Sequence, residues 1–334
     1  MPVNDEPGMA HGTVAGIFNS AVAAWAIGAA WELGALDELN GARKLDAEDF
    51  AERLGLDPAS TAGMFRALAS VGVVTRDGAT VTASRNFDEV FRTRSFFHWL
   101  SRGSAELFRQ MPSIMRMENR TGAFYRRDPA AIAFACEEID RVTYEPAFRA
   151  VLDGIDVGSG RIADLGCGAG GRLRDMLARC PRARGIGVDI APAALASARA
   201  ALNEAGLGDR VDLVEDDVRA LAFRPEFADV EVITCFMMGH DLWPRAECAA
   251  TLRRLREVFP AARRLVLGDA TSTRHVPDAA LPVFTLGFEL AHDLMGTFIP
   301  ARADWESLFG EGGWRLLRTH RLDIVVGEVI FELA

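Results

Sequence analysis

A glycine-rich segment bounded by an acidic residue is the first feature of the sequence that could bind a ligand. It reads Asp164-Leu-Gly166-Cys-Gly168-Ala-Gly170, and it joins a short apolar strand to a helix predicted over 171–180. Glycines at such a turn let the backbone approach a ligand and present amide groups at a helix N-terminus. An acidic residue just before them would repel a pyrophosphate, so the segment suits a ligand that carries a cationic or amino group.

Further acidic residues follow the next two predicted strands. Asp189 ends the run GIGVD, where a carboxylate can accept both hydroxyl groups of a ribose. Asp216 and Asp217 follow the third strand, where an acid can receive the exocyclic amine of adenine. The whole set resembles the class I S-adenosylmethionine methyltransferases, in which the acid at Asp164 would organise the methionine end of the cofactor, Asp189 the ribose and Asp217 the adenine. A plain nucleotide-binding or degenerate Rossmann-like domain is the alternative.

Two histidines in separate apolar segments form a second candidate site. His240 lies in the run CFMMGHDLWP after the fourth predicted strand, and His292 lies in a helix predicted over 281–296. Ligands of open α/β sheets bind beyond the carboxyl ends of the strands, and both histidines are expected at that edge. Two neutral imidazoles with a carboxylate nearby can hold a divalent or trivalent metal ion and leave coordination positions open. Asp241 could complete such a set, or orient His240 from outside it.

Aromatic and methionine side chains accompany His292 along its helix. Phe284, Phe288 and Met295 are spaced so that they share one face with the histidine. A stripe of this kind is commonly part of a packed core, and it is also the lining that a pocket for a small organic molecule needs.

Composition narrows the class of protein. The chain has 334 residues, of which 49% are hydrophobic and 25% charged, as in an ordinary globular protein. Its net charge of −10 argues against nucleic acid as a partner, because nucleic-acid binding needs a basic face. Five scattered cysteines without a CxxC pair fit a reducing, cytoplasmic setting. We find no signal-peptide pattern at the start and no uninterrupted apolar run of about 18 residues, so we expect no membrane span.

The second half of the sequence alternates short apolar strands with helical runs from about residue 161 onward. This pattern predicts an α/β fold, with a parallel, Rossmann-like sheet and helices on both faces. Two last strands follow each other without a helix between them, which favours an antiparallel pair. We therefore expect a catalytic domain at 156–334, a helical linker that roofs the site at 101–155, and a helical and winged-helix dimerisation domain at 1–100.

The N-terminal part carries the prediction of a homodimer. The segment 12–39 is helical in pattern, rich in Ala and Gly, and apolar on nearly every face, which suggests burial against a second subunit. Two helices, the first capped by Asp46, and a hairpin with an Asp77-Gly78 turn are typical of a winged helix. The second of these helices carries a single charge, Arg66, which is too little for contacts with a DNA groove, so we expect dimerisation rather than DNA binding.

The resemblance extends over nearly the whole chain. The domain order is that of the small-molecule O-methyltransferases, whose His-Asp-x-Trp or His-Asp-Trp stretch is similar to the segment from His240 to Trp243. The runs NRTGAFYRRD, CFMMGHDLWPR, LGDAT, PVFTLGFELAHDLMG and FHWL resemble more closely the α-keto-acid β-methyltransferases of peptide-antibiotic pathways. This resemblance implies S-adenosyl-L-methionine as cofactor and one mononuclear metal ion held by His240 and His292. It favours iron(III), although two histidines also suit zinc.

The same resemblance implies methylation at carbon. An α-keto acid can chelate a metal ion through its carboxylate and keto oxygens, and the resulting enolate has a nucleophilic β-carbon. Asp241, a metal-bound water or hydroxide, and an imidazole not bound to metal are candidates for the base, with Asp241 favoured by its place beside His240. Arg127 matches a family run and suits the substrate carboxylate, although it could equally form an ordinary salt bridge. The candidates for the pocket wall, each of which could instead belong to the core, are Trp99, Met237, Phe284, Phe288 and Met295.

Alternatives from other classes stay open at this point. A metal-free O-methyltransferase of a phenol would use His240 as general base and would not need His292. A DNA-binding regulator would use the winged helix, which the charge pattern opposes. Among substrates, phenylpyruvate, 4-hydroxyphenylpyruvate, 4-methyl-2-oxovalerate and a guanidino keto acid are compatible with the motifs, and the apolar lining argues against the last.

Overall fold

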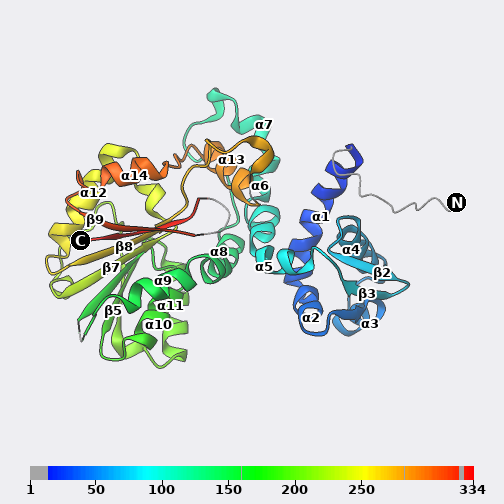
Figure 1. Cartoon of the computed structure of the whole chain (residues 1–334), viewed down its shortest axis with the longest axis horizontal. Coiled ribbons are helices and arrows are strands. Elements are labelled where there is room, and N and C mark those ends of the chain that lie inside the picture. Colours follow the sequence, from blue (N-terminus) through cyan, green and yellow to red (C-terminus); the bar gives the residue numbers. More distant parts are fainter. Residues whose placement is uncertain (1–13, 159, 282, 323–326) are drawn as a thin grey trace. The chain divides into compact units, whose positions relative to one another are not determined.

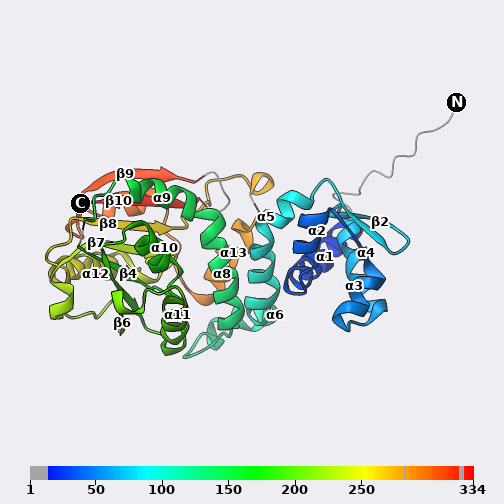
Figure 2. The ribbon, with the colours of Figure 1, turned by 90° about the horizontal axis from the view of Figure 1, so that it is seen from below.

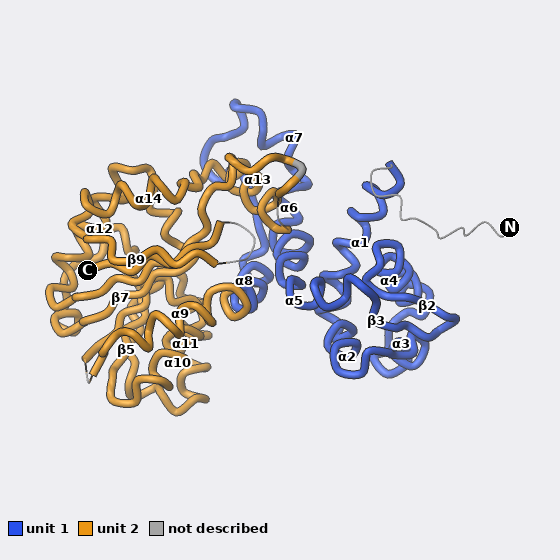
Figure 3. Tube along the Cα trace, viewed as in Figure 1, with its two compact units in different colours: residues 1–139 blue, residues 140–334 orange. Residues whose placement is uncertain are grey.

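The computed structural model describes residues 14–158, 160–281, 283–322 and 327–334. The chain forms two compact units, residues 1–139 and 140–334 (Figure 3). The first two residues of the helix predicted from position 12 lie outside the described residues, and so does position 282 in the helix predicted over 281–296.

The first unit combines a small antiparallel sheet with helices. Its three strands, in the order β1-β3-β2, are β1 (Lys44–Asp46), β2 (Val74–Asp77) and β3 (Thr80–Ala83). Its helices are α1 (Val14–Glu32), α2 (Ala35–Ala42), α3 (Ala47–Leu54), α4 (Pro58–Ser70), α5 (Phe87–His98), α6 (Ala105–Arg109), α7 (Met111–Ile114) and most of α8 (Pro129–Thr143). A π-helical turn, Trp99–Gly103, directly follows α5.

Local sequence signals explain these elements. The Asp46 carboxylate accepts hydrogen bonds from two backbone amides of the first turn of α3, so the predicted N-cap is confirmed. Asp57 caps α4 in the same way, ahead of Pro58. The predicted hairpin is also confirmed: β2 and β3 pair antiparallel, and Gly78 at the turn has a φ of 58°, which glycine adopts without strain.

Helix α1 is only partly buried within one chain, so its burial against a second subunit stays a prediction. Ala23, Ile27 and Ala30 are buried, but Phe18 is 70% and Trp25 is 55% exposed. By length and composition, α1 is the one described helix that could cross a membrane, a test that core helices of soluble proteins also pass. Exposed apolar side chains gathered on one helix commonly mark a surface that binds a partner.

The second unit is built on a seven-stranded sheet in the order β6-β5-β4-β7-β8-β10-β9. Five strands are parallel, and β10 pairs antiparallel with β9, as the sequence predicted, and also with β8. The strands are β4 (Arg161–Leu165), β5 (Arg184–Asp189), β6 (Val211–Glu215), β7 (Val230–Phe236), β8 (Arg264–Asp269), β9 (Leu316–Arg321) and β10 (Val329–Leu333).

Helices cover both faces of this sheet (Figures 1 and 2). One core cluster joins the sheet to α9 (Glu145–Asp153), α10 (Gly171–Arg179) and α11 (Pro192–Glu204). The other joins it to α12 (Arg245–Val258) and α14 (Arg302–Leu308). Strand order reverses between β4 and β7, which opens a crevice at their carboxyl ends where ligands of such sheets bind.

Candidate functional site

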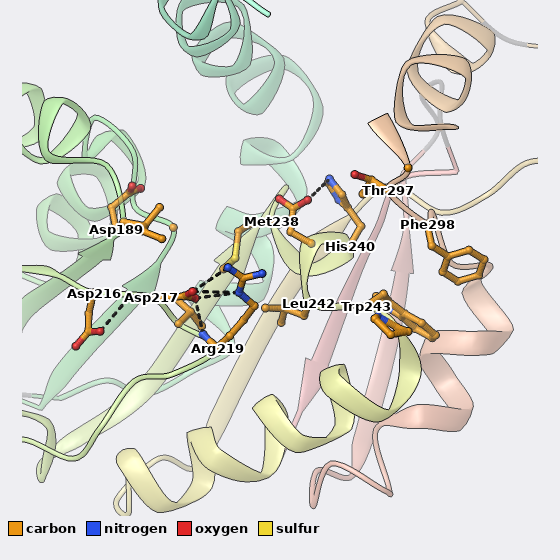
Figure 4. Close-up of a pocket in the computed structure, with 16 residues that line it drawn as sticks. Asp189, Asp216, Asp217, Arg219, Met238, His240, Leu242, Trp243, Thr297 and Phe298 are labelled. Carbon is orange, nitrogen blue, oxygen red and sulfur yellow. Dashed lines mark hydrogen bonds and ion pairs between the residues drawn. The ribbon is translucent and has the colours of Figure 1, made fainter. Parts of the chain in front are cut away.

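A cavity of 580 Å³ lies at the carboxyl ends of the strands of the second unit (Figure 4). It brings together side chains that the sequence places far apart. Its lining includes Gly166, Asp189, Asp216, Asp217, Met238, His240 and Asp241, together with Arg219, Trp243, Thr297 and Phe298.

The glycine loop forms the turn between β4 and α10. Gly166, Gly168 and Gly170 have φ values of 69°, 54° and 79°, in the left-handed region that side chains disfavour. The Asp189 carboxylate accepts the Gly168 amide at 2.9 Å and the Ala191 amide at 2.9 Å. One acid therefore fixes the loop and the start of α11 together. Gly168 and Gly170 shape the turn but do not line the cavity.

Asp164 does not line this cavity. It is buried, and its Oδ1 accepts a hydrogen bond of 2.6 Å from the Thr234 hydroxyl on β7. Burial raises the pKa of Asp164 to about 6, an effect that the nearby Arg172 guanidinium partly opposes. At neutral pH this acid is a buried negative charge at the end of β4.

The two acids after β6 are both bound to arginines. Arg219 pairs with Asp217 at 2.8 Å and holds the pKa of that carboxyl below its usual range. Arg224 pairs with Asp216 at 2.9 Å. Figure 4 shows Asp216 and Asp217 on the same side of the cavity as Asp189.

His240 lies in a short 3-10 turn, Gly239–Leu242, and is held by a carboxylate that sequence reasoning missed. Asp269, fully buried at the end of β8, accepts the His240 amide at 2.6 Å and its Nδ1–H at 2.7 Å. Because a carboxylate only accepts hydrogen bonds, Nδ1 carries the proton and the lone pair of the neutral ring lies on Nε2. The signal for Asp269 was an acid at the end of the fifth predicted strand, in the run LGDAT.

His292 is brought directly to His240 by α13 (Thr285–Met295). The two ring centroids lie 5.0 Å apart, with the ring planes at 88°. His292 Nδ1 donates to the Phe288 carbonyl at 2.7 Å, which also sets the Nδ1–H tautomer. Histidines that bind metal are commonly oriented in this way by an acceptor at the second nitrogen. Among the described residues, however, no group of three or more His, Cys, Asp or Glu side chains gathers as a metal site.

Asp241 accepts neither the His240 amide nor its Nδ1–H, the two groups that are bound to Asp269. Its carboxylate lies 4.0 Å from His240 Nε2, and its side chain is 59% exposed. The acid that orients the imidazole is therefore Asp269, while Asp241 lies at the opposite ring nitrogen and lines the cavity.

Four of the predicted pocket residues, namely Phe284, Phe288, Met237 and Met295, belong to the second unit. Phe288 contacts both imidazoles, with centroids 4.0 Å from His292 and 5.9 Å from His240. Phe284 precedes the first turn of α13 with a φ of 74°, so it is not on the helical face as predicted, and it packs on Phe288. Met237 has a φ of 52°, and its sulfur accepts the Tyr144 hydroxyl at 3.1 Å. Met295 is buried at the end of α13.

Trp99 and Arg127 belong to the first unit. Trp99 is buried in the π-helical turn, and the Arg127 guanidinium lies 5.9 Å from the centre of its ring. In the second unit, sequence reasoning missed an aromatic wall of the cavity, where Trp243 and Phe298 lie with ring centroids 5.4 Å apart.

Comparison with known proteins places this chain in a family. Residues 162–260 match the family model of the methyltransferase domain. The chain is 49% identical over 329 residues to Methyltransferase ungE' of Aspergillus campestris, and the match covers 96% of each protein. The chain belongs to the methyltransferases. It is an S-adenosylmethionine-dependent enzyme of class I, built like the O-methyltransferases.

Two further likenesses bear on this methyltransferase. It is 35% identical over 157 residues to Indolepyruvate C-methyltransferase of Streptomyces griseus, which is 46% of each chain. The structure of human N-acetylserotonin methyltransferase in complex with S-adenosylmethionine matches with a TM-score of 0.70 and 17% identity over 99% of both chains. At that identity the second likeness shows the methyltransferase fold alone.

Proposed function

We propose that this methyltransferase transfers a methyl group to the β-carbon (C3) of an α-keto acid with an apolar or aromatic side chain. The observation that carries the proposal is the pair His240 and His292, with ring centroids 5.0 Å apart and an acceptor behind each Nδ1. A methyltransferase that only deprotonates a hydroxyl group needs one histidine. The partial likeness to a C-methyltransferase of indolepyruvate, itself an α-keto acid, supports the same direction.

The donor chemistry of the pair fits one mononuclear metal ion. Both imidazoles have the Nδ1–H tautomer, so His240 and His292 would hold the ion through Nε2. Iron(III) is our first choice and zinc the alternative. When bound, such an ion supplies Lewis acidity toward the keto and carboxylate oxygens of the substrate.

The protein residues then divide the remaining work. Asp241, beside His240 Nε2 and open to the cavity, takes the proton from C3. The electron pair of the broken C–H bond forms the new C–C bond to the methyl carbon, and the C–S bond breaks to leave S-adenosylhomocysteine. Arg127 is kept as the proposed partner of the substrate carboxylate on the strength of its family run alone. Asp269 keeps His240 in its tautomer and orientation.

The acids of the cavity bind the cofactor in this proposal. Asp189 accepts the ribose hydroxyls, and Asp216 and Asp217 receive the adenine amine. Asp164 provides the negative charge for the ammonium group at the methionine end, while Gly166, Gly168 and Gly170 allow the close approach of the backbone.

Substrate choice follows from the apolar surroundings of the histidine pair. None of Phe284, Phe288 and Met295 lines the cavity, and Phe288 and Met295 are buried, but Phe284 and Phe288 make the surroundings of the histidines aromatic. In this proposal such apolar surroundings favour phenylpyruvate, 4-hydroxyphenylpyruvate or 4-methyl-2-oxovalerate over a guanidino keto acid. Transamination of the product would give a β-methyl amino acid, a building block for a peptide antibiotic.

We also propose a homodimer whose contact includes α1. Phe18 and Trp25 are exposed on α1, and a neighbouring apolar groove of 480 Å³ is lined by Val22, Leu33 and Met64 among others. A second copy would bury this surface, and the winged-helix part of the first unit would serve dimerisation.

A second candidate function keeps one observation in its favour. The Asp269–His240 pair is also how a general base is oriented, so a metal-free enzyme could methylate a phenolic oxygen. The test is a substrate panel with purified enzyme and S-adenosylmethionine. We expect methylated product from phenylpyruvate or 4-methyl-2-oxovalerate and none from simple phenols. Turnover of the phenols alone would favour the second candidate.

A further inference from the structure

A buried arginine of the second unit forms an ion pair with one carboxylate and lies within electrostatic range of another. Arg172 is the second residue of α10, directly after the glycine loop, and its side chain is 8% exposed. Its guanidinium lies 3.4 Å from the centre of the Phe236 ring and forms an ion pair with Asp140. The aromatic ring and the carboxylate together fix the plane of the guanidinium.

Asp164 is the other carboxylate near this arginine. It is buried, and its hydrogen bond comes from the neutral Thr234 hydroxyl rather than from a cation. The Arg172 charge is near enough to lower the pKa of Asp164, yet Arg172 makes its ion pair with Asp140. The guanidinium of Arg172 is always charged, so it neutralises the acid with which it pairs. Because it pairs with Asp140, the negative charge of Asp164 is left without a cation among the described residues.

We infer that Asp140 is a positioning residue for cofactor binding: by holding Arg172 against Phe236, it leaves the charge of Asp164 for the ammonium group of S-adenosylmethionine. Asp140 itself does not line the cofactor cavity. The inference rests on the role proposed above for Asp164. Without Asp140, Arg172 would turn to the other acid and compete with the ammonium group for it.

Two ligands separate this role from a purely structural one. S-adenosylhomocysteine carries the ammonium group, and 5′-methylthioadenosine has the same nucleoside without the amino-acid part. At pH 8, where Asp164 is ionised, calorimetry with Asp140→Asn should show an affinity for S-adenosylhomocysteine about tenfold weaker than that of the wild type. The affinity for 5′-methylthioadenosine should change by less than about twofold.

Variants that lack the Arg172 side chain form the second part of the experiment. Arg172→Met keeps an apolar contact with Phe236 and should bind S-adenosylhomocysteine at least as tightly as the wild type. The double variant Asp140→Asn/Arg172→Met should return to within about threefold of the wild type, because the competing cation is gone. Asp153→Asn, which breaks the exposed ion pair with Arg179, is the matched control and should change nothing.

Several outcomes of these binding measurements would contradict the role inferred for Asp140. Unchanged affinity in Asp140→Asn, equal losses for both ligands, or a double variant as weak as the single one would overturn the inference. If Asp140→Asn does not fold, a loss of S-adenosylhomocysteine binding in folded Arg172→Met overturns it as well. Asp164→Asn tests the role of Asp164 separately from that of Asp140. If this variant binds S-adenosylhomocysteine and 5′-methylthioadenosine as the wild type does, the proposed role of Asp164 is wrong. If it loses affinity for S-adenosylhomocysteine alone while Asp140→Asn does not, only the role of Asp140 is wrong.

Discussion

His240 and His292 pack edge to face, with ring centroids 5.0 Å apart and ring planes at 88°, although they come from a turn after β7 and from α13. Each Nδ1 is bound to its own acceptor, the Asp269 carboxylate and the Phe288 carbonyl. The lone pairs of both neutral rings are thus on Nε2. This relationship separates two chemistries, because a general-base mechanism needs one imidazole and a metal-assisted one needs both.

Replacement of His292 by Ala tests that separation. We expect the variant to lose bound metal, measured by elemental analysis, because one imidazole holds an ion poorly. It should also lose the exchange of the β-hydrogens of the keto acid with D2O in the absence of S-adenosylmethionine. His275→Ala, at an exposed loop position, is the control and should keep both properties. Full activity in a metal-free His292→Ala enzyme would contradict the proposal.

Asp269 and Asp241 should differ in what their removal affects. Asp269→Asn disturbs the tautomer and orientation of His240, so we expect activity to fall by about 10–100-fold, together with weaker metal binding. Asp241→Asn should keep the metal and slow the β-hydrogen exchange, because it removes the proposed base. Elemental analysis and deuterium incorporation, measured on both variants, check this. An Asp241→Asn enzyme with wild-type exchange would exclude Asp241 as the base.

The pH dependence of cofactor affinity should report Asp164. Its pKa is raised to about 6, so the carboxyl is largely charged at pH 7 and largely neutral at pH 5. Because the ammonium group needs the charged form, affinity for S-adenosylhomocysteine should fall by about tenfold from pH 7 to pH 5. Asp164→Asn should bind weakly at both values. Calorimetry at the two pH values measures this, and an equal fall in the variant would assign the effect to another group.

The contribution of Asp164 to protein stability should increase as the pH falls, whereas its contribution to cofactor affinity should decrease. The folded-state pKa of Asp164 lies above its ordinary value of 3.8, so the folded protein binds this proton more tightly than the unfolded chain does. The contribution of this carboxyl to the free energy of unfolding is therefore present at low pH and is lost as the pH rises from about 4 to about 6. Denaturant unfolding of the wild type and Asp164→Asn, compared across this range, isolates that contribution.

The exposed face of α1 should control the oligomeric state. We expect the wild type to have the mass of a dimer by light scattering and Phe18→Asp to shift toward the monomer, because a charge would be buried in the contact. Phe223→Asp, at an exposed position in the second unit, should leave the mass unchanged. A wild-type mass equal to that of one chain at micromolar concentration would reject the dimer.

The parallel sheet and the place of the acids at its carboxyl edge could be predicted because local signals specify them. The glycine turn needs left-handed backbone at Gly166, Gly168 and Gly170, and Asp164 and Asp189 lie at the carboxyl ends of mostly buried strands. The carboxyl ends of parallel strands meet at one edge, so position along the chain already indicates position in space. The meeting of His240 and His292 followed from the same rule.

Other features depend on contacts that no local pattern encodes. Asp269 reads as the last residue of a strand, and only the pairing of β7 with β8 brings it to the His240 ring. The exposure of Phe18 could not be foreseen either, because α1 is apolar all round and its sequence does not show which face the first unit leaves uncovered. Phe284 was predicted from helical spacing, but α13 begins one residue later.

The position of the transferred methyl group tests the central claim most directly. The measurement is NMR of the product formed from phenylpyruvate and S-adenosylmethionine labelled with 13C in its methyl group. We predict a labelled methyl carbon bonded to C3 and coupled to the single remaining hydrogen there, with no label in an ether or ester. A labelled methyl group on oxygen would contradict the account and would establish the O-methyltransferase alternative.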